Sequence, residues 1–306
     1  MDDAKNTEKV DDGIMTIIAT GTHNNSKEKA MSNLALNLPE QHYLTLQNGL
    51  TVHYLDEGEG DIVIWLHGSG PGASGYSNFK NNYPKFASQG FRNIVLDLPG
   101  FGRSDKPNDV HYNLDFFVSV LNEIIETLHL SPCTLLGNSL GGAIALGQAL
   151  KYPSSVNKLI LMAPGGVEER ETYFEMEGIQ KMVATYNQGP MGIHEMREVM
   201  SLQLHDSSQL SDDILRERVA VAVTQPKELF STMMVPNMTQ ELNQLACPVL
   251  GFWGSNDRFN PPSGVFKFLD NVPDAKFLLL NQCGHWVQVE HTDLFNKTCL
   301  DFLLGQ

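Results

Sequence analysis

Two kinds of hydrophobic spacing divide the chain. Residues 42–46 and 51–55 alternate between apolar and polar positions around the sequence Gln-Asn-Gly-Leu at 47–50. An Asn-Gly pair between two alternating segments predicts a β-hairpin with a tight turn. The sheet is therefore expected to begin antiparallel.

Downstream, the apolar positions come in short unbroken runs, which are typical of strands buried on both faces. The runs are residues 62–66, 93–96, 134–136, 158–162, 249–253 and 276–280. Helical periodicity lies between several of them, with its clearest apolar face at Phe117, Leu121, Ile124, Ile125 and Leu128. Asn113 or Asp115 is the expected cap of that helix. Alternating strands and helices predict an α/β fold with a mostly parallel central sheet and helices on both faces.

The stretch from 166 to 245 has a different pattern, with helix-like segments rich in Met, Gln and Glu. An insertion between two core strands would lie over the carboxyl ends of the sheet, where open α/β folds bind ligands. We therefore expect a helical lid at 166–245 above an α/β core built from 39–165 and 246–306. Residues 1–38 are polar and irregular and are expected to form a mobile arm.

Composition narrows the classes of partner. The 306 residues are 42% hydrophobic and carry a formal net charge of -15, whereas nucleic acid or an anionic membrane would call for clustered Lys and Arg. No run of 18 apolar residues occurs in the sequence, so no membrane span is expected. The four cysteines lack C-x-x-C spacing, which favours neither disulfides nor a zinc site. The expected location is the cytoplasm.

The pentad Gly137-Asn138-Ser139-Leu140-Gly141 follows one apolar run and precedes a helical pattern. A G-x-S-x-G turn between a strand and a helix presents its serine on a sharp bend, and the glycines let the two elements approach. The start of the helix also favours an anion. By itself the pentad equally fits an ordinary loop. Ser139 is a candidate nucleophile that needs a base and a carboxylate from elsewhere.

Both partners are available at the ends of predicted strands. Asp257 comes just after the run at 249–253, and His285 follows the last run in the sequence Cys-Gly-His-Trp. The chain order Ser, Asp, His is that of α/β-hydrolases. His291 is a weaker candidate base, because it begins a polar helix and is expected at the surface. We predict a triad of Ser139, Asp257 and His285.

An acyl-transfer intermediate also needs two backbone N–H donors for its oxyanion. Leu140, directly after the serine, is expected to supply one. The glycine-rich loop 67–72 follows a predicted strand, and Ser69 is expected to supply the other, although the loop could be a simple tight turn. His67 is interpreted as structural.

Together these motifs resemble the meta-cleavage product hydrolases, α/β-hydrolases that cut a carbon–carbon bond in ring-opened aromatic or steroid catabolites. The resemblance covers about residues 40–304 and rests on His67-Gly68-Ser69-Gly70-Pro71-Gly72-Ala73 with Ser77-Asn78-Phe79, Gly137-Asn138-Ser139, Gly254 with Asp257-Arg258-Phe259, and Cys283-Gly284-His285-Trp286 with Glu290-His291. It implies a 2-hydroxy-6-oxo-hexa-2,4-dienoate substrate with a further group on carbon 6. Water would cleave it to 2-hydroxypenta-2,4-dienoate and a carboxylic acid (EC 3.7.1.-), without metal or organic cofactor.

The resemblance further implies substrate-binding residues. Arg218 matches the family's lid arginine and would bind the substrate carboxylate, while the nearby Arg216, or a surface role, stays open. Asn78 and Asn138 match positions that hydrogen-bond the carboxylate and hydroxyl end. Trp286 would pack against the dienoate. Their structural alternatives are a helix cap for Asn78, strain of the serine turn for Asn138 and core packing for Trp286.

One departure from the family lies at Gln203, where some members have an aromatic residue close to the bond that is cut. The carbon 6 group therefore stays open between aryl, alkyl and steroid-derived, although the run 282–290 is most similar to the steroid-degrading branch. A carboxylesterase with the same triad and a receptor of the same fold are alternative functions. The resemblance suggests a homo-oligomer, a dimer or larger.

Overall fold

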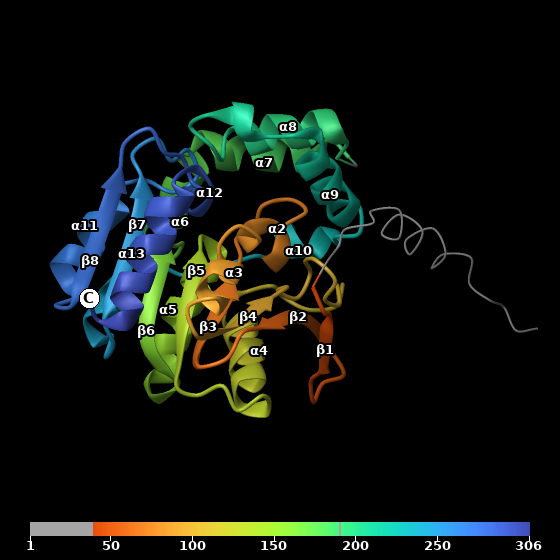
Figure 1. Cartoon of the computed structure of the whole chain (residues 1–306). Coiled ribbons are helices and arrows are strands. Elements are labelled where there is room, and N and C mark those ends of the chain that lie inside the picture. Colours follow the sequence, from red (N-terminus) through yellow and green to blue (C-terminus); the bar gives the residue numbers. More distant parts are fainter. Residues whose placement is uncertain (1–38, 190) are drawn as a thin grey trace, which may run out of the picture. The chain divides into compact units, whose positions relative to one another are not determined.

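The computed structural model describes residues 39–189 and 191–306, so the arm expected at 1–38 lies outside the described residues. Its centre is an eight-stranded sheet in the order β1-β2-β4-β3-β5-β6-β7-β8 (Figure 1). The strands are β1 (His42–Thr45), β2 (Thr51–Glu57), β3 (Asp61–Leu66), β4 (Phe91–Leu96), β5 (Cys133–Asn138), β6 (Val156–Met162), β7 (Val249–Gly254) and β8 (Ala275–Leu280). β1 with β2 and β2 with β4 pair antiparallel, and the pairs from β4 to β8 are parallel. The predicted α/β fold with a mostly parallel sheet is confirmed.

The N-terminal hairpin forms where the alternating pattern predicts it. Leu44 of β1 lies opposite Val52 of β2, and the turn closes with hydrogen bonds from Leu46 N to Leu50 O (2.8 Å) and from Gly49 N to Leu46 O (2.9 Å). Gly49 adopts a φ of 85°, which glycine tolerates without strain.

Helices cover both faces of the sheet. Because successive strand side chains point to opposite faces, Ile64 and Leu66 pack in one hydrophobic cluster and Val63 and Trp65 in another. The first cluster includes side chains of α4 (Leu114–Thr127), α5 (Leu140–Lys151), α11 (Gly264–Asn271) and η3 (Thr239–Gln244). The second includes side chains of α2 (Gly75–Phe79), α3 (Tyr83–Ala87), α12 (Val287–Glu290) and α13 (Thr292–Leu304). Asn113 caps α4 by accepting from Phe116 N (2.9 Å).

The last strand departs from the predicted burial on both faces. β8 ends the sheet and pairs only with β7 among the described strands. It is half-buried, and Leu279 is 47% exposed. As an edge strand, β8 has a neighbouring strand on one side only. Part of its surface, including Leu279, is therefore open to solvent.

The stretch between β6 and β7 forms helices above the carboxyl ends of the strands (Figure 1). They are α6 (Arg170–Glu175), α7 (Glu177–Asn187), α8 (Ile193–Ser201), η2 (Ser207–Gln209), α9 (Asp212–Ala222) and α10 (Lys227–Ser231), followed by η3. A further short 3-10 helix, η1 (Pro153–Ser155), precedes β6. We call residues 166–245 the lid. Its methionines 191, 196 and 200 pack with Trp286 in a cluster of their own. Among the described residues, every helix is too short or too polar to span a membrane.

Candidate active site

Ser139 stands on a strained bend between β5 and α5. Its backbone has φ 54° and ψ −113°, a conformation that L-residues adopt only when their surroundings impose it. The surroundings are close: a Cβ added to Gly137 would lie 2.3 Å from Gly141 O, and one added to Gly141 would lie 2.0 Å from Leu66 O. The two glycines thus allow β3, β5 and α5 to meet, and the bend presents Ser139 to a pocket.

His285 and Asp257 meet at the ends of β8 and β7. His285 Nδ1 donates to Asp257 Oδ2 (2.7 Å), while Oδ1 accepts from Phe259 N (2.7 Å) and Asn260 N (3.0 Å). Both side chains are buried. With its Nδ1 proton held by the carboxylate, the neutral imidazole presents Nε2 as an acceptor, which is the tautomer that a general base requires.

A pocket beneath the lid brings most of the predicted site residues together. The predicted residues that line it are Ser69, Asn78, Asn138, Ser139, Arg218, His285 and Trp286. Leu140 begins α5 beside the serine, and Asp257 lies behind the histidine.

Sequence reasoning missed the apolar wall of this pocket. Ile179, Met182 and Phe259 also line it, and the Phe259 ring lies 5.2 Å from the His285 ring. Ile179 and Met182 belong to α7, where helical spacing predicts an apolar face but does not tell whether that face lines the pocket or the core. Phe259 lies in the loop after β7, where no periodicity marks it. His291, the rival base, is half-buried between α12 and α13 and lies outside this set of pocket residues.

Arg218 is the buried cation of the pocket. Only 1% of it is exposed; Nη1 donates to Pro71 O (3.2 Å), Nη2 donates to the Asn78 side-chain oxygen, and the guanidinium stacks 4.5 Å from the Trp286 ring. Burial lowers its pKa to about 10, with Glu217 opposing the shift, so the group stays charged at neutral pH. Arg216, the open alternative, is on the surface beside Asp213 (3.0 Å).

The two asparagines have different surroundings. Asn138 donates from Nδ2 to Met162 O (3.2 Å) and His285 O (3.4 Å), whereas its Oδ1 is buried without a partner in the described chain. Asn78 lies within α2, and Ser74 caps that helix. The helix-cap interpretation of Asn78 is therefore wrong.

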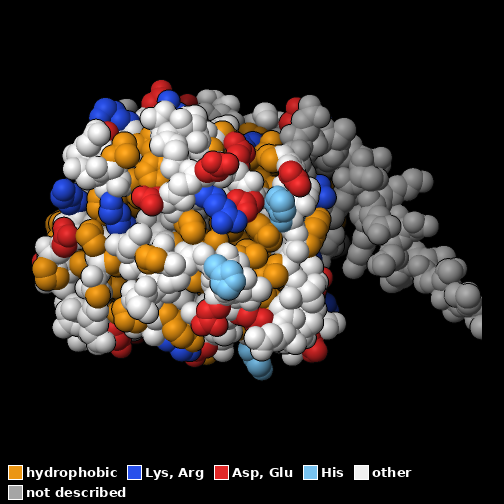
Figure 2. Space-filling view, turned by 60° about the horizontal axis from the view of Figure 1, so that its bottom comes forward, with side chains coloured by type: hydrophobic (Ala, Val, Ile, Leu, Met, Phe, Trp, Pro, Cys, Tyr) orange, Lys and Arg blue, Asp and Glu red, His pale blue; other side chains and the backbone are white. Residues whose placement is uncertain are grey.

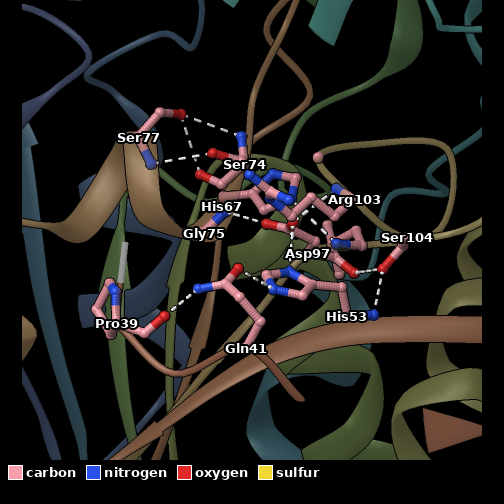
Figure 3. A network of polar contacts seen from close by, with 12 residues as sticks. Pro39, Gln41, His53, His67, Ser74, Gly75, Ser77, Asp97, Arg103 and Ser104 are labelled. Atoms are coloured by element: carbon pink, nitrogen blue, oxygen red, sulfur yellow. Dashed lines mark hydrogen bonds and ion pairs between the residues drawn. The ribbon is translucent and has the colours of Figure 1, made fainter. Parts of the chain in front are cut away.

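A buried polar network begins at His67, the first residue of the glycine-rich loop (Figure 3). His67 Nδ1 donates to Gly68 O (2.8 Å), and Nε2 accepts from Leu98 N (3.1 Å). Asp97 accepts from His53 Nδ1 (2.7 Å) and from Gly75 N (2.7 Å). His67 therefore orders the loop, as its structural interpretation predicted.

Burial and hydrogen bonding set the protonation of this network. Burial lowers the pKa of His67 to about 4, although the negative charge of Asp97 opposes the shift. Burial alone would raise the pKa of Asp97, but the hydrogen bond and charge of His53 outweigh it and bring the value to about 2. At neutral pH, His67 is thus neutral and Asp97 is charged. Across the described chain, no three His, Cys, Asp or Glu side chains are grouped as metal ligands.

Comparison with known proteins points to one group of hydrolases. A family model for the alpha/beta hydrolase fold matches residues 61–292. The 2-hydroxy-6-oxononadienedioate/2-hydroxy-6-oxononatrienedioate hydrolase of Comamonas testosteroni is 37% identical over 262 residues, covering 82% of this chain and 91% of that protein. The 2-hydroxy-6-oxo-6-phenylhexa-2,4-dienoate hydrolase of Burkholderia cepacia is 35% identical over 261 residues, covering 82% and 91%.

Solved structures agree on the fold. The meta-cleavage product hydrolase CumD of Pseudomonas fluorescens IP01 superimposes with a TM-score of 0.76 at 27% identity, covering 86% of this chain and 97% of that one. An esterase from Exiguobacterium antarcticum reaches a TM-score of 0.74 at 21% identity, covering 85% and 98%. Fold alone therefore does not separate carbon–carbon hydrolysis from ester hydrolysis.

Proposed function

The chain belongs to the meta-cleavage product hydrolases of the α/β-hydrolase family, and from this premise we propose that it hydrolyses a carbon–carbon bond (EC 3.7.1.-). Its substrate is a 2-hydroxy-6-oxo-hexa-2,4-dienoate with a further group on carbon 6, as formed in aromatic or steroid catabolism. The products are 2-hydroxypenta-2,4-dienoate and a carboxylic acid. The observation that carries the proposal is the buried cation Arg218 in the same pocket as Ser139 and His285.

The substrate must first convert to a tautomer from which the carbon 5 fragment can leave. Cleavage between carbons 5 and 6 leaves an electron pair on carbon 5, which is stable only if it can flow into a carbonyl group. His285 removes the proton of the carbon 2 hydroxyl and delivers a proton to carbon 5. The resulting 2,6-diketone has a carbonyl at carbon 2 that is conjugated, through the double bond between carbons 3 and 4, with carbon 5.

Ser139 then acts as the nucleophile. Its Oγ attacks carbon 6 while His285 Nε2 accepts the proton, and Asp257 stabilises the imidazolium that forms. The N–H groups of Ser69 and Leu140 stabilise the oxyanion. Collapse breaks the bond between carbons 5 and 6, and its electrons reach the carbon 2 oxygen, which takes the proton from His285. Water releases the acid from Ser139 by the same steps.

Binding residues orient the dienoate for these steps. The Arg218 guanidinium binds the carboxylate, with its buried and unpartnered Nε as the free donor in the described chain. Asn78 and Asn138 hydrogen-bond the carboxylate and hydroxyl end, and Trp286 packs against the planar diene. The scheme uses no metal or organic cofactor.

The decisive experiment follows the visible absorbance of the dienolate. Purified protein is mixed with a panel of ring-opened catechol products that differ in the group on carbon 6, with Ser139→Ala as control. Rapid bleaching by the wild type alone supports the proposal, and the fastest substrate defines the carbon 6 group. Slow bleaching beside fast turnover of p-nitrophenyl esters would instead indicate a carboxylesterase.

A non-catalytic receptor is the alternative of a different class. The hydrogen-bonded His285–Asp257 pair beside Ser139 counts against it, because a binding protein has no need to activate a serine. Failure of a fluorophosphonate to label Ser139 in the folded wild type would favour the receptor.

The proposed location of the enzyme and its proposed oligomeric state follow from its cysteines and its exposed apolar side chains. The enzyme acts in the cytoplasm, which suits its four free and buried cysteines. It forms a homo-oligomer, a dimer or larger, which would cover Phe266 (59% exposed), Leu269 and Leu279 near the β8 edge. Light scattering that returns a monomer mass at working concentration would contradict the oligomer.

A further inference from the structure

A buried carboxylate lies next to the arginine of the pocket. Glu217 directly precedes Arg218 in α9, and only 7% of the residue is exposed. Its Oε2 accepts a hydrogen bond from Nζ of the half-buried Lys80 (2.9 Å). A carboxylate is costly to remove from water unless a cation pairs with it. Among the described residues, Lys80 is the only cation within 4.0 Å of this carboxylate, since Arg216 pairs on the surface with Asp213 (3.0 Å).

The ion pair joins the same two helices that meet at Arg218. Lys80 directly follows α2, which carries Asn78, and the Asn78 side-chain oxygen accepts from Arg218 Nη2. Burial lowers the pKa of Arg218, and the charge of Glu217 opposes that shift, so the carboxylate acts on the guanidinium. A carboxylate at this place that lacked a cation of its own would weaken the attraction of Arg218 for an anionic ligand.

Other contacts already hold α9 against the glycine-rich loop. Gly72 N donates to Gln225 Oε1 (3.0 Å), and Gln225 Nε2 donates to Gly100 O (3.2 Å). The backbone of Arg218 lies so close to Gly72 that a side chain on this glycine would collide with Arg218 O. The half-exposed ion pair is therefore not needed to dock the lid, and its charges call for another role.

We propose that Lys80 is a positioning residue that acts through Glu217: by neutralising this carboxylate, it leaves the positive charge of Arg218 free for the carboxylate of the substrate. Two cations and one anion leave one positive charge, which matches one substrate carboxylate. The inference rests on the proposed function, because it places the substrate carboxylate on Arg218.

The test compares 6-oxoheptanoate, an unreactive anion, with 6-oxoheptanamide, a neutral molecule of the same length. Their dissociation constants are measured by calorimetry for the wild type, Lys80→Met, Glu217→Gln and the double variant. In Lys80→Met the anion should bind about tenfold more weakly, the effect of one uncompensated charge at short range, while binding of the amide should change less than about twofold. The double variant lacks both charges, so it should bind the anion within about threefold of the wild type.

Lys181→Met is the matched control, because it breaks another Lys–Glu pair of the lid, the one with Glu198 (2.8 Å), without freeing a carboxylate beside Arg218. It should bind both ligands as the wild type does. A double variant as weak as Lys80→Met would show that the ion pair is a structural clamp and would overturn the inference, as would unchanged anion binding in Lys80→Met. Should Lys80→Met not fold, Glu217→Gln decides: it should bind the anion at least as tightly as the wild type, and weaker binding overturns the inference.

Turnover separates this inference from the proposed function. In Lys80→Met, KM for a dienoate should rise about tenfold at nearly constant kcat, because the charge acts equally on the bound substrate and on the transition state. A wild type that bleaches no dienoate refutes the proposed function, while calorimetry still decides the charge balance at Arg218. A wild type that binds the anion no better than the amide overturns the inference itself.

Discussion

Arg218 shows how one buried charge defines the chemistry of a pocket. Its hydrogen bonds run to neutral oxygens, the carbonyl of Pro71 and the amide of Asn78, while the neighbouring Glu217 pairs with Lys80 (2.9 Å). A guanidinium removed from water and bonded only to neutral groups is unfavourable, which is the cause of its lowered pKa. An anionic ligand would supply the missing charge.

Replacing that charge should separate the two hydrolase functions. In Arg218→Met, kcat/KM for a dienoate should fall about 10- to 150-fold, the loss of one hydrogen bond to a charged group. Turnover of p-nitrophenyl acetate should change less than about threefold, because a neutral ester has no carboxylate to bind. Arg216→Met, on the lid surface, is the matched control. Equal losses on both substrates would mean that Arg218 acts on the catalytic residues rather than on the substrate.

The glycines around Ser139 give a second prediction for single residues. Gly141→Ala would place a methyl group 2.0 Å from Leu66 O, so β3 and α5 must move apart at a cost of about 1–3 kcal/mol or more. Urea unfolding should show the loss, and fluorophosphonate labelling of Ser139 should slow. Gly165→Ala is the control, since its methyl group would meet ordinary contacts at 3.7 Å. Similar losses in both variants would show that the crowding at Gly141 is not the cause.

A site residue can be predicted from the sequence only where a local pattern marks it. Ser139, Asp257 and His285 could be proposed because each follows a strand pattern, and parallel strands bring their carboxyl ends to one edge. The place of Gln203 in the pocket could not, because it depends on a contact between distant segments, the hydrogen bond from His285 N to Gln203 O. The choice between Arg216 and Arg218 likewise needed the direction in which α9 faces.

Long helices and buried strands could be predicted, because their hydrophobic positions form clear patterns in the sequence. The apolar runs predicted the strands of the sheet. Of the two expected caps of α4, Asn113 and Asp115, the structure shows Asn113. The short helices α2, α3 and α12 were not predicted, since four or five residues are too few for helical periodicity to appear. In α2 a capping box between Ser74 and Ser77 fixes the helix start, a pairing that lacks the usual Glu or Gln.

Glu290 of α12 connects the lid segment to the histidine loop and gives the prediction for elements. Glu290→Ala removes the acceptor of the N–H groups of Gly284, His205 and Asp206. Partial replacement by water should limit the loss to about 2 kcal/mol of stability, while kcat/KM for a dienoate should fall about tenfold as His285 loses its position. Hydrogen exchange at the amides of His205 and Asp206 should accelerate.

The control for this variant is Asp293→Asn, which changes an exposed carboxylate at the start of α13. It should leave exchange and activity near wild type. Unchanged exchange at His205 and Asp206 in Glu290→Ala would refute the connection between the two segments.

For the whole molecule, net charge affects the approach of an anionic substrate, and buried charges affect stability. On the face shown in Figure 2, basic side chains lie interspersed with acidic ones and small hydrophobic groups. With a formal charge of -15, the protein repels anions at long range, so an anionic substrate depends on local groups such as Arg218. Among the titratable groups buried next to the glycine-rich loop, His67 and Asp97 have shifted pKa values, so their protonation is linked to folding.

These buried groups predict how the free energy of unfolding depends on pH. His67 has a folded pKa of about 4 and an ordinary value of 6.5 when unfolded, so the unfolded chain binds a proton first as the pH falls. Stability is full above pH 6.5 and declines by about 3 kcal/mol down to pH 4. Asp97, with a folded pKa of about 2, adds its own loss only below its ordinary value of 3.8.

Urea unfolding at pH 7.5, 5.5 and 4.5 checks this, with His67→Gln as the comparison. The variant should be less stable at pH 7.5 but should lose less stability than the wild type between pH 7.5 and 4.5, because no imidazole is left to titrate there. Parallel curves would refute the assignment to His67. A proton forced onto His67 Nε2 also ends its bond from Leu98 N, which loosens the loop carrying Ser69. Activity should therefore fall near pH 4 before the whole molecule unfolds.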